Sequence, residues 1–136
     1  MEWETCCSQR LVKEVMPDNN LIDSLKQSSR DVIKTNETIA LNETTASTKV
    51  SLMYDSVREL LEALALSKGF KIYNHECFAA FLAAKCGKTH LAVQFDRFRK
   101  IRNRLRYYGQ RIIPKEVNFL IGEMKALYAE ITNMLK

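Results

Sequence analysis

The 136-residue sequence is poor in the residues that interrupt helices, because it contains only four glycines and two prolines. Hairpins and tight turns use both residues heavily, so this scarcity argues against a β-rich fold and favours helices. No apolar run approaches the roughly 20 residues that a membrane-spanning helix needs. The opening residues, MEWETCCSQR, lack the basic stretch and apolar core of a signal peptide. We therefore expect a cytoplasmic protein that does not associate with a membrane.

The four cysteines also lack the spacing of a metal site or a redox pair. None of them forms a CxxC motif, and no histidine or cysteine lies at zinc-finger spacing. Adjacent cysteines rarely form a sound structural bridge, which argues against a pair within Cys6 and Cys7. We expect four free thiols in a reducing compartment, with Cys77 and Cys86 filling the core, and no metal or other cofactor.

Hydrophobic periodicity predicts an all-α fold, most simply an antiparallel bundle of four to five helices. Residues 1–17 form a weakly patterned N-terminal segment, and residues 18–136 form a single bundle domain. No strand pattern is evident. The predicted helices cover about 18–40, 48–69, 74–87, 90–109 and 114–135, and their expected end signals are Asp18, Gly69, Asn74, Gly87, Thr89 and Pro114.

Positive charge is concentrated in one short segment. The chain has a net charge of +5, yet residues 96–111 carry seven basic residues against one aspartate, a local net charge of +6. The rest of the chain is therefore close to neutral. A focused field of this kind attracts phosphate-bearing partners, so we expect a nucleic-acid-binding surface that includes Arg97, Arg99, Lys100, Arg104, Arg106 and Arg111.

Arg102 differs from its basic neighbours in its place on the helical wheel. At about 100° per residue, Lys100, Arg104 and Arg97 fall on the solvent side, whereas Arg102 falls within the apolar arc, between Phe95 and Phe98. Such an arginine either pairs with a carboxylate or extends along its own stem to water, or else it faces a groove and binds a phosphate with both arms of its guanidinium. Gly109, on the same face, is either a helix C-cap or a point of close backbone approach.

The same region resembles a known family. The run FDRFRKIRNRLRYYG, preceded by YDSVRELLEALALSKGFKIYNHECFAAFL, resembles small prokaryotic and archaeal members of the HEPN superfamily over residues 48–136. The resemblance implies a HEPN-like helical bundle that forms a homodimer and acts on RNA. It also implies a toxin-type role in a toxin–antitoxin or defence system, with a nucleotidyltransferase antitoxin as partner.

The resemblance further implies a metal-independent ribonuclease site built on an Arg-polar-His motif. Arg102 matches the arginine and Asn103 the polar residue, while the histidine position falls at Tyr107, Tyr108 or Gly109. We therefore take Arg102, Asn103, Tyr107 and Tyr108 as candidate catalytic residues.

The absence of the motif histidine leaves several functions open. A phenol with a pKa of about 10 exchanges protons poorly near pH 7, where an imidazole does so readily. On a regular helix Arg102 and Tyr107 also point about 140° apart, so their convergence requires a distorted helix or a second subunit. Alternatives are an RNA binder without cleavage, a non-catalytic dimer that binds a nucleotide or partners a nucleotidyltransferase, and a purely structural bundle.

The remaining polar candidates have simpler interpretations. His75, Glu76 and Cys77 fall within one helical turn, facing different ways, so a surface histidine in a first turn is favoured over a metal site. The same holds for His90. Tyr108 falls on the apolar face and is expected in the core. Tyr107 falls outward among arginines, where it either stacks on a base or is merely exposed.

Overall fold

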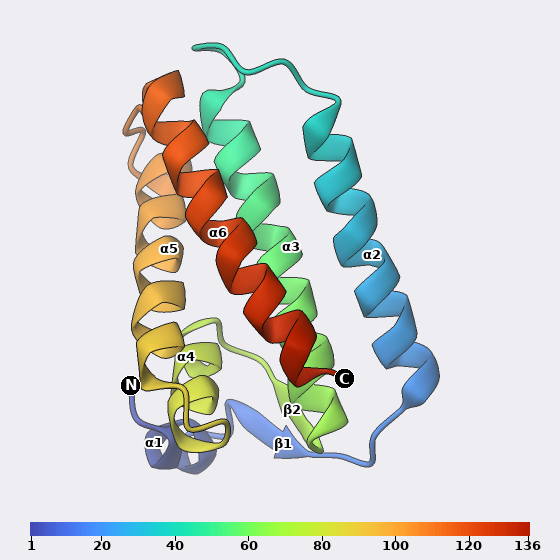
Figure 1. Cartoon of the computed structure of the whole chain (residues 1–136). Helices are drawn as coiled ribbons and strands as arrows, with labels where there is room; N and C mark the ends of the chain where they lie inside the picture. Colours follow the sequence, from blue (N-terminus) through green and yellow to red (C-terminus); the bar gives the residue numbers. More distant parts are fainter.

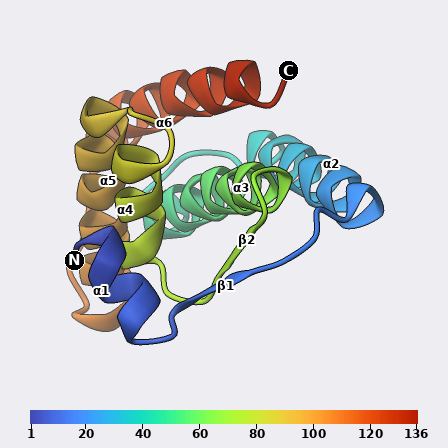
Figure 2. The ribbon, with the colours of Figure 1, turned by 90° about the horizontal axis from the view of Figure 1, so that it is seen from below.

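The computed structural model describes all 136 residues and contains six α-helices and one small sheet. The four long helices run alternately up and down in Figure 1, which confirms the expected all-α bundle. Viewed from below, α3 lies in the middle, with α2 on one side, α4 and α5 on the other, and α6 across it (Figure 2). The elements, in chain order, are α1 (Trp3–Ser8), β1 (Val12–Glu14), α2 (Asn19–Glu37), α3 (Ala46–Ser67), β2 (Phe70–Ile72), α4 (Glu76–Ala84), α5 (Thr89–Tyr107) and α6 (Pro114–Met134).

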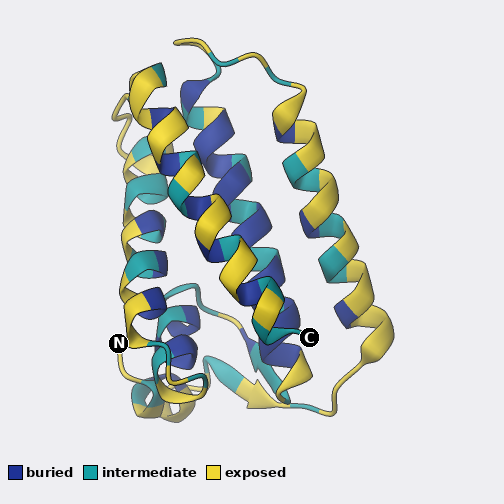
Figure 3. Cartoon of the chain, in the orientation of Figure 1, coloured by how far each residue is buried: buried dark blue, intermediate teal, exposed yellow.

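The core is built around α3, which is the most buried helix (Figure 3). Its apolar stripe is buried along its whole length, and neighbouring helices cover it on several sides, as the ridges-into-grooves packing of helices allows. The buried stripe consists of Val50, Met53, Tyr54, Val57, Leu60, Leu61 and Leu64. The Tyr54 ring stacks on Phe95 of α5 with 5.4 Å between ring centroids, and this contact fixes α5 beside α3 at the level of the candidate site.

Most helix ends follow the sequence signals. The Asp18 side chain accepts a hydrogen bond from the Leu21 amide at 3.1 Å, and Pro114 is in the first turn of α6. Asn74 lies one residue before the N-cap of α4, which is His75, and its Oδ1 accepts from the Glu76 amide at 2.8 Å. Thr89 is not a cap. It is the first residue of α5, after Lys88, and its side chain makes no capping hydrogen bond.

The long helix α2 packs on α3 through polar as well as apolar contacts. Its buried residues are Ile22, Ser29 and Asn36, and its other leucine, isoleucine and valine side chains are half-buried or exposed. The Ser29 hydroxyl hydrogen-bonds the Tyr128 hydroxyl of α6 at 2.7 Å. Lys49 of α3 donates to the Asn36 and Ile39 carbonyls, which satisfies backbone oxygens at the end of α2.

Residues 1–17 carry a helix and a strand rather than an irregular segment. Strand β1 pairs antiparallel with β2, with Val12 opposite Ile72, and the Val15 amide donates to the Gly69 carbonyl at 2.9 Å. Gly69 adopts φ +88°, the left-handed conformation that ends α3 and turns the chain into β2. A strand of three residues whose partners lie 56 to 60 positions away has no periodicity of its own, which is why the sequence pattern did not predict it.

The expectation of four free thiols is wrong. Cys6 of α1 and Cys77 of α4 form a disulfide, with 6.0 Å between their Cα atoms, whereas Cys7 and Cys86 are free. The fold brings together two cysteines 71 positions apart, and their spacing in the sequence gave no signal of this. The cysteines therefore do not support the expectation of a reducing compartment. None of the helices is both long and apolar enough to cross a membrane.

Candidate functional site

Apart from Arg102, the basic residues of segment 96–111 fall into two groups, and those of the first group form ion pairs. Arg97 binds Glu123 of α6 at 2.6 Å, while Arg99 and Lys100 bind Asp96 at 2.9 and 3.1 Å. Burial alone would raise the pKa of Asp96, but the hydrogen bonds from Lys100 and Arg99 outweigh it and lower that pKa. Arg99 also lies 3.9 Å from a carboxylate oxygen of Glu76, so these three cations are paired with three carboxylates of the chain itself.

The second group lies at the C-terminal end of α5 and has no acidic partner. Arg104, Arg106 and Arg111 are exposed and make no ion pair. Between them in the chain lie Tyr107 and Tyr108, whose side chains are 66% and 76% exposed. We call these five residues the α5 terminal surface. It combines three free guanidinium groups with two exposed aromatic rings.

A cavity of about 280 Å³ adjoins this surface between α5 and α6. Arg104 and Arg111 lie on its wall, together with the apolar side chains of Ile101, Leu105 and Ile112. Phe119 of α6 also lines the cavity and is 73% exposed. A larger cavity, of about 880 Å³, lies between α1, α4 and α5 and is also lined by Arg104. Arg104 thus lines both of these cavities.

Arg102 is held inward, as its place on the helical wheel predicts, but against α3 rather than in a cavity. Its side chain is only 13% exposed, its guanidinium lies 5.3 Å from the centre of the Tyr54 ring, and its nearest carboxylate oxygen, in Asp55, is 3.8 Å away. Neither cavity described above is lined by Arg102. The geometry therefore supports the carboxylate-paired interpretation of Arg102, with a cation–π contact added.

The pairing of Arg102 is nevertheless incomplete. Its Nε is buried and has no hydrogen-bond partner, and the contact with Asp55 is long for an ion pair. One terminal nitrogen donates to Asn103 Oδ1 at 3.3 Å and to the Tyr107 hydroxyl at 3.4 Å. One chain therefore brings together Arg102, Asn103 and Tyr107 without a second subunit. The arginine side chain is long enough to reach Tyr107, although the two residues point in different directions from the helix.

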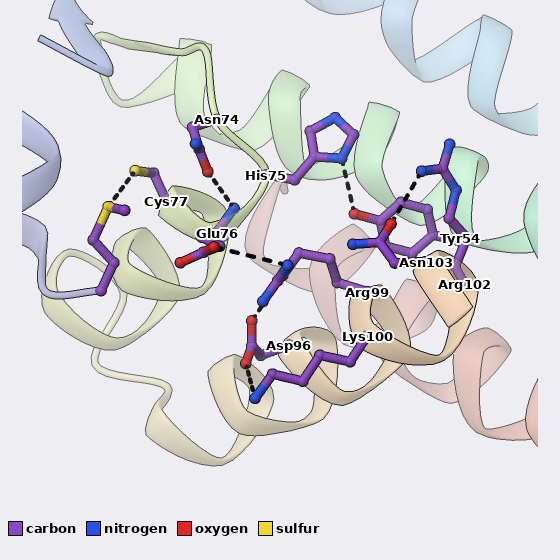
Figure 4. Close-up of polar contacts among 11 residues, drawn as sticks. Tyr54, Asn74, His75, Glu76, Cys77, Asp96, Arg99, Lys100, Arg102 and Asn103 are labelled. Carbon is purple, nitrogen blue, oxygen red and sulfur yellow. Dashed lines mark hydrogen bonds and ion pairs between the residues drawn. The ribbon is translucent and has the colours of Figure 1, made fainter. Parts of the chain in front are cut away.

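The structure adds two residues that the sequence did not place at the site (Figure 4). The Tyr54 hydroxyl and the His75 Nδ1 form a hydrogen bond of 3.1 Å, so an imidazole lies beside the ring on which Arg102 packs. Burial, and then the charges of Arg58 and Arg102, lower the pKa of His75. Burial also raises the pKa of Tyr54, which stays protonated. His75 is thus half-buried and partnered, not the surface histidine that was expected.

Neither residue carried a recognisable signal in the sequence. Tyr54 belongs to the apolar stripe of α3, and His75 precedes Arg102 by 27 positions on a different helix. Only the packing of α3, α4 and α5 brings them together. No three His, Cys, Asp or Glu side chains come close enough to hold a metal ion.

Two expectations for the end of α5 are also settled by the structure. Tyr108 is exposed rather than in the core, because α5 ends at Tyr107 and the apolar face ends with it. Gly109 has φ +64° and nothing within 4 Å of its Cβ position, so it ends the helix and no backbone of this chain approaches it closely.

No family model matches the chain, and neither a curated protein nor a solved structure shows detectable similarity to it. The function is therefore argued from the geometry of the site and from the resemblance in its motif.

Proposed function

We propose that the protein binds RNA through the α5 terminal surface and is a HEPN-type protein. The observation that carries this proposal is the separation of the α5 cations into a paired and an unpaired group. A cation already neutralised by a carboxylate gains little from a phosphate, whereas Arg104, Arg106 and Arg111 are free to bind one each.

The aromatic residues of the same surface favour a single-stranded nucleic acid. Tyr107 and Tyr108 are exposed beside unpaired arginines, and stacking of a base on an aromatic ring contributes about 1–3 kcal/mol. Bases are available for such stacking in single strands and loops, not in a duplex. The substrate class that fits this surface is single-stranded RNA, with its phosphates on the arginines and its bases on the tyrosines.

The cavity between α5 and α6 favours a second candidate function, the binding of a mononucleotide without turnover. Its apolar wall and the exposed Phe119 ring suit a base, and Arg104 and Arg111 suit its phosphates. RNA and a nucleotide would then compete for the same two arginines. The homodimer and the nucleotidyltransferase antitoxin belong to this proposal through the HEPN resemblance.

The test of RNA binding is its dependence on salt. We expect the purified chain to bind a fluorescent single-stranded RNA, with an affinity that falls as the salt concentration rises, measured by fluorescence anisotropy. Each phosphate contact contributes about 0.7 to the slope of log affinity against log salt for a single strand. In the triple variant R104A/R106A/R111A, the magnitude of that slope should therefore be smaller by about 2 than in the wild type.

Arg30→Ala provides the control, because Arg30 is an exposed arginine on α2, far along the chain from the α5 terminal surface. It should leave both the affinity and the slope as in the wild type. A wild-type chain without affinity for RNA, or a triple variant that binds like the wild type, would refute the proposed function. Displacement of the RNA by a mononucleotide, lost in the Arg111→Ala variant, would establish the second candidate.

A further inference from the structure

A third cavity, of about 640 Å³, lies beside the α5 terminal surface, and we call it the loop cavity. It is formed where the α2–α3 loop meets the α5–α6 loop, and Figure 1 shows both loops at the same end of the bundle. Ligand pockets commonly measure about 300–1,000 Å³. Arg111 belongs both to the lining of the loop cavity and to the α5 terminal surface, so RNA on that surface would lie at the edge of the cavity. The lining consists of Glu43, Thr44, Ser47, Leu105 and residues 109–113.

The lining of the loop cavity suits a base better than a phosphate. Glu43 is exposed and forms no ion pair with any residue of the chain. Its carboxylate would repel a phosphate group inside the cavity. Leu105, Ile112 and Ile113 give the same cavity an apolar part that can cover the face of a base. Arg111 is the only cation of the lining, so it is the group that can hold the phosphate of the same strand.

The hydrogen-bonding groups of the lining select one of the four bases. An ionised carboxylate has only acceptors, so its two oxygens pair best with two neighbouring donors. Guanine alone presents such a pair on its Watson–Crick edge, N1–H and the N2 amino group. Adenine and cytosine place a ring-nitrogen acceptor beside their amino group, and uracil places its N3–H between two carbonyl oxygens. The hydroxyls of Thr44 and Ser47 and the amide of Gln110 also line the cavity, and each can donate to guanine O6.

The loop that carries Glu43 is fixed by its own hydrogen bonds. Asn42 Oδ1 accepts from the amides of Thr44 and Thr45 at 2.9 and 3.1 Å. The Thr45 hydroxyl donates to the Ala40 carbonyl at 2.6 Å and accepts from the Asn42 amide at 3.0 Å. A loop that is ordered before binding loses less conformational entropy when a ligand binds. Glu43 can therefore contact a base without reordering of its backbone.

We propose that the loop cavity binds one guanine base of the RNA and that Glu43 determines this specificity. The Glu43 carboxylate accepts hydrogen bonds from N1–H and from the N2 amino group of guanine, while Arg111 binds a phosphate of the same strand. The inference rests on the proposed binding of RNA. It makes a single-stranded RNA with an unpaired guanine the preferred ligand, and it assigns the preference to the α2–α3 loop instead of to the basic helix.

The experiment compares RNAs that differ at one base. Four fluorescent oligouridines carry guanosine, inosine, adenosine or uridine at one central position, and fluorescence anisotropy gives the affinity of each. The wild-type chain should bind the guanosine RNA at least about fivefold more tightly than the adenosine and uridine RNAs, which is the lower end of the discrimination that a bidentate contact with a base provides. Inosine lacks the N2 amino group, so the affinity of its RNA should fall between these.

Three variants separate the base contact from the phosphate contact. Glu43→Gln places an amide donor against the donors of guanine, so its affinities for the guanosine and uridine RNAs should agree within about twofold. Glu130→Gln removes the same charge from an exposed position of α6 and, as the matched control, should keep the wild-type preference. Arg111→Ala should weaken the binding of all four RNAs by a similar factor, because a phosphate contact carries no base preference. Circular dichroism of each variant checks that it folds.

The outcomes distinguish the inference from the proposal on which it rests. A wild-type chain that binds all four RNAs equally well overturns the guanine site and leaves RNA binding standing. So does a Glu43→Gln variant that keeps the wild-type preference, or an inosine RNA that binds as tightly as the guanosine RNA. A wild-type chain that binds none of the four RNAs overturns the proposed function, and the guanine site with it.

Discussion

At the scale of single residues, Arg102 is held between α5 and α3. Its stacking on Tyr54 and its contact with Asp55 explain why a guanidinium can remain inside the apolar arc of α5. Its unpartnered Nε and long ion pair show that the chain does not satisfy it fully.

The electrostatic coupling of Arg102 to His75 makes a prediction at the same scale. Replacing Arg102 with alanine removes one of the positive charges that disfavour the imidazolium form, so the pKa of His75 should rise. The pKa should remain below its ordinary value, because burial, the largest cause, persists in part. The measurement is a titration of the histidine ring protons by NMR.

The chain has only two histidines, so His90→Gln assigns the two resonances. In the wild type, the His75 resonance should titrate below pH 6.5. A His75 resonance with the same pKa in Arg102→Ala as in the wild type would show that the charge of Arg102 does not act on the His75 imidazole.

At the scale of elements, α5 changes role along its length. Its first half packs Leu91, Phe95 and Phe98 into the core and pairs its cations with carboxylates. Its last turn carries Arg104 and Arg106 without partners. Cations at a helix C-terminus also interact favourably with the helix dipole, by about 0.3–1 kcal/mol each. That effect explains two arginines in the last turn, but it does not explain the exposed tyrosines beside them or Arg111 beyond the helix.

The junction between α2 and α3 depends on one buried lysine. Lys49 is 9% exposed and donates to two carbonyls at the end of α2, while its own backbone carbonyl accepts from the side-chain Nδ2 of Asn36 at 3.0 Å. Lys49→Met keeps the length of the side chain and removes the donors. We expect a loss of about 1–3 kcal/mol in the free energy of unfolding, measured by urea denaturation.

Lys34→Met is the matched control, because Lys34 is exposed on α2 and should change stability by less than about 0.5 kcal/mol. An equal effect of the two variants would show that Lys49 does not hold the end of α2.

The elements also show what the sequence could predict. The stripe of α3, Pro114 at the start of α6 and Asp18 at the start of α2 are local signals, and the helices follow them. The inward position of Arg102 is likewise a property of one helix and was predicted from its periodicity. What surrounds Arg102 was not predictable in this way, because Tyr54 and His75 come from other helices.

At the scale of the whole molecule, two long-range connections tie residues 1–17 to the bundle. One is the pairing of β1 with β2, and the other is the disulfide between Cys6 and Cys77. Each joins parts of the chain that are far apart in sequence, and neither leaves a periodic pattern. This is why the sequence predicted a weakly patterned segment there, although Cys6 is fully buried and Trp3 packs edge-on against Phe70.

Reduction of the disulfide should destabilise the fold. A bridge between cysteines 71 positions apart restricts the unfolded chain, and a loop of that length contributes about 4 kcal/mol in the chain-entropy model. We expect a lower urea midpoint under reducing conditions and in the variant C6A/C77A. The variant C7A/C86A removes only free thiols and should respond to reductant like the wild type. An unchanged midpoint on reduction would show that the bridge does not stabilise the fold.

The central claim is that unpaired cations at the end of α5, and not its total charge, bind RNA. Two double variants test this directly, because each removes two exposed positive charges. R97A/K100A removes cations that pair with Glu123 and Asp96, and R104A/R111A removes cations without partners. Measured by anisotropy on the same single-stranded RNA at one salt concentration, R104A/R111A should weaken binding on the order of tenfold and R97A/K100A less than twofold. Equal losses in the two variants would contradict the account.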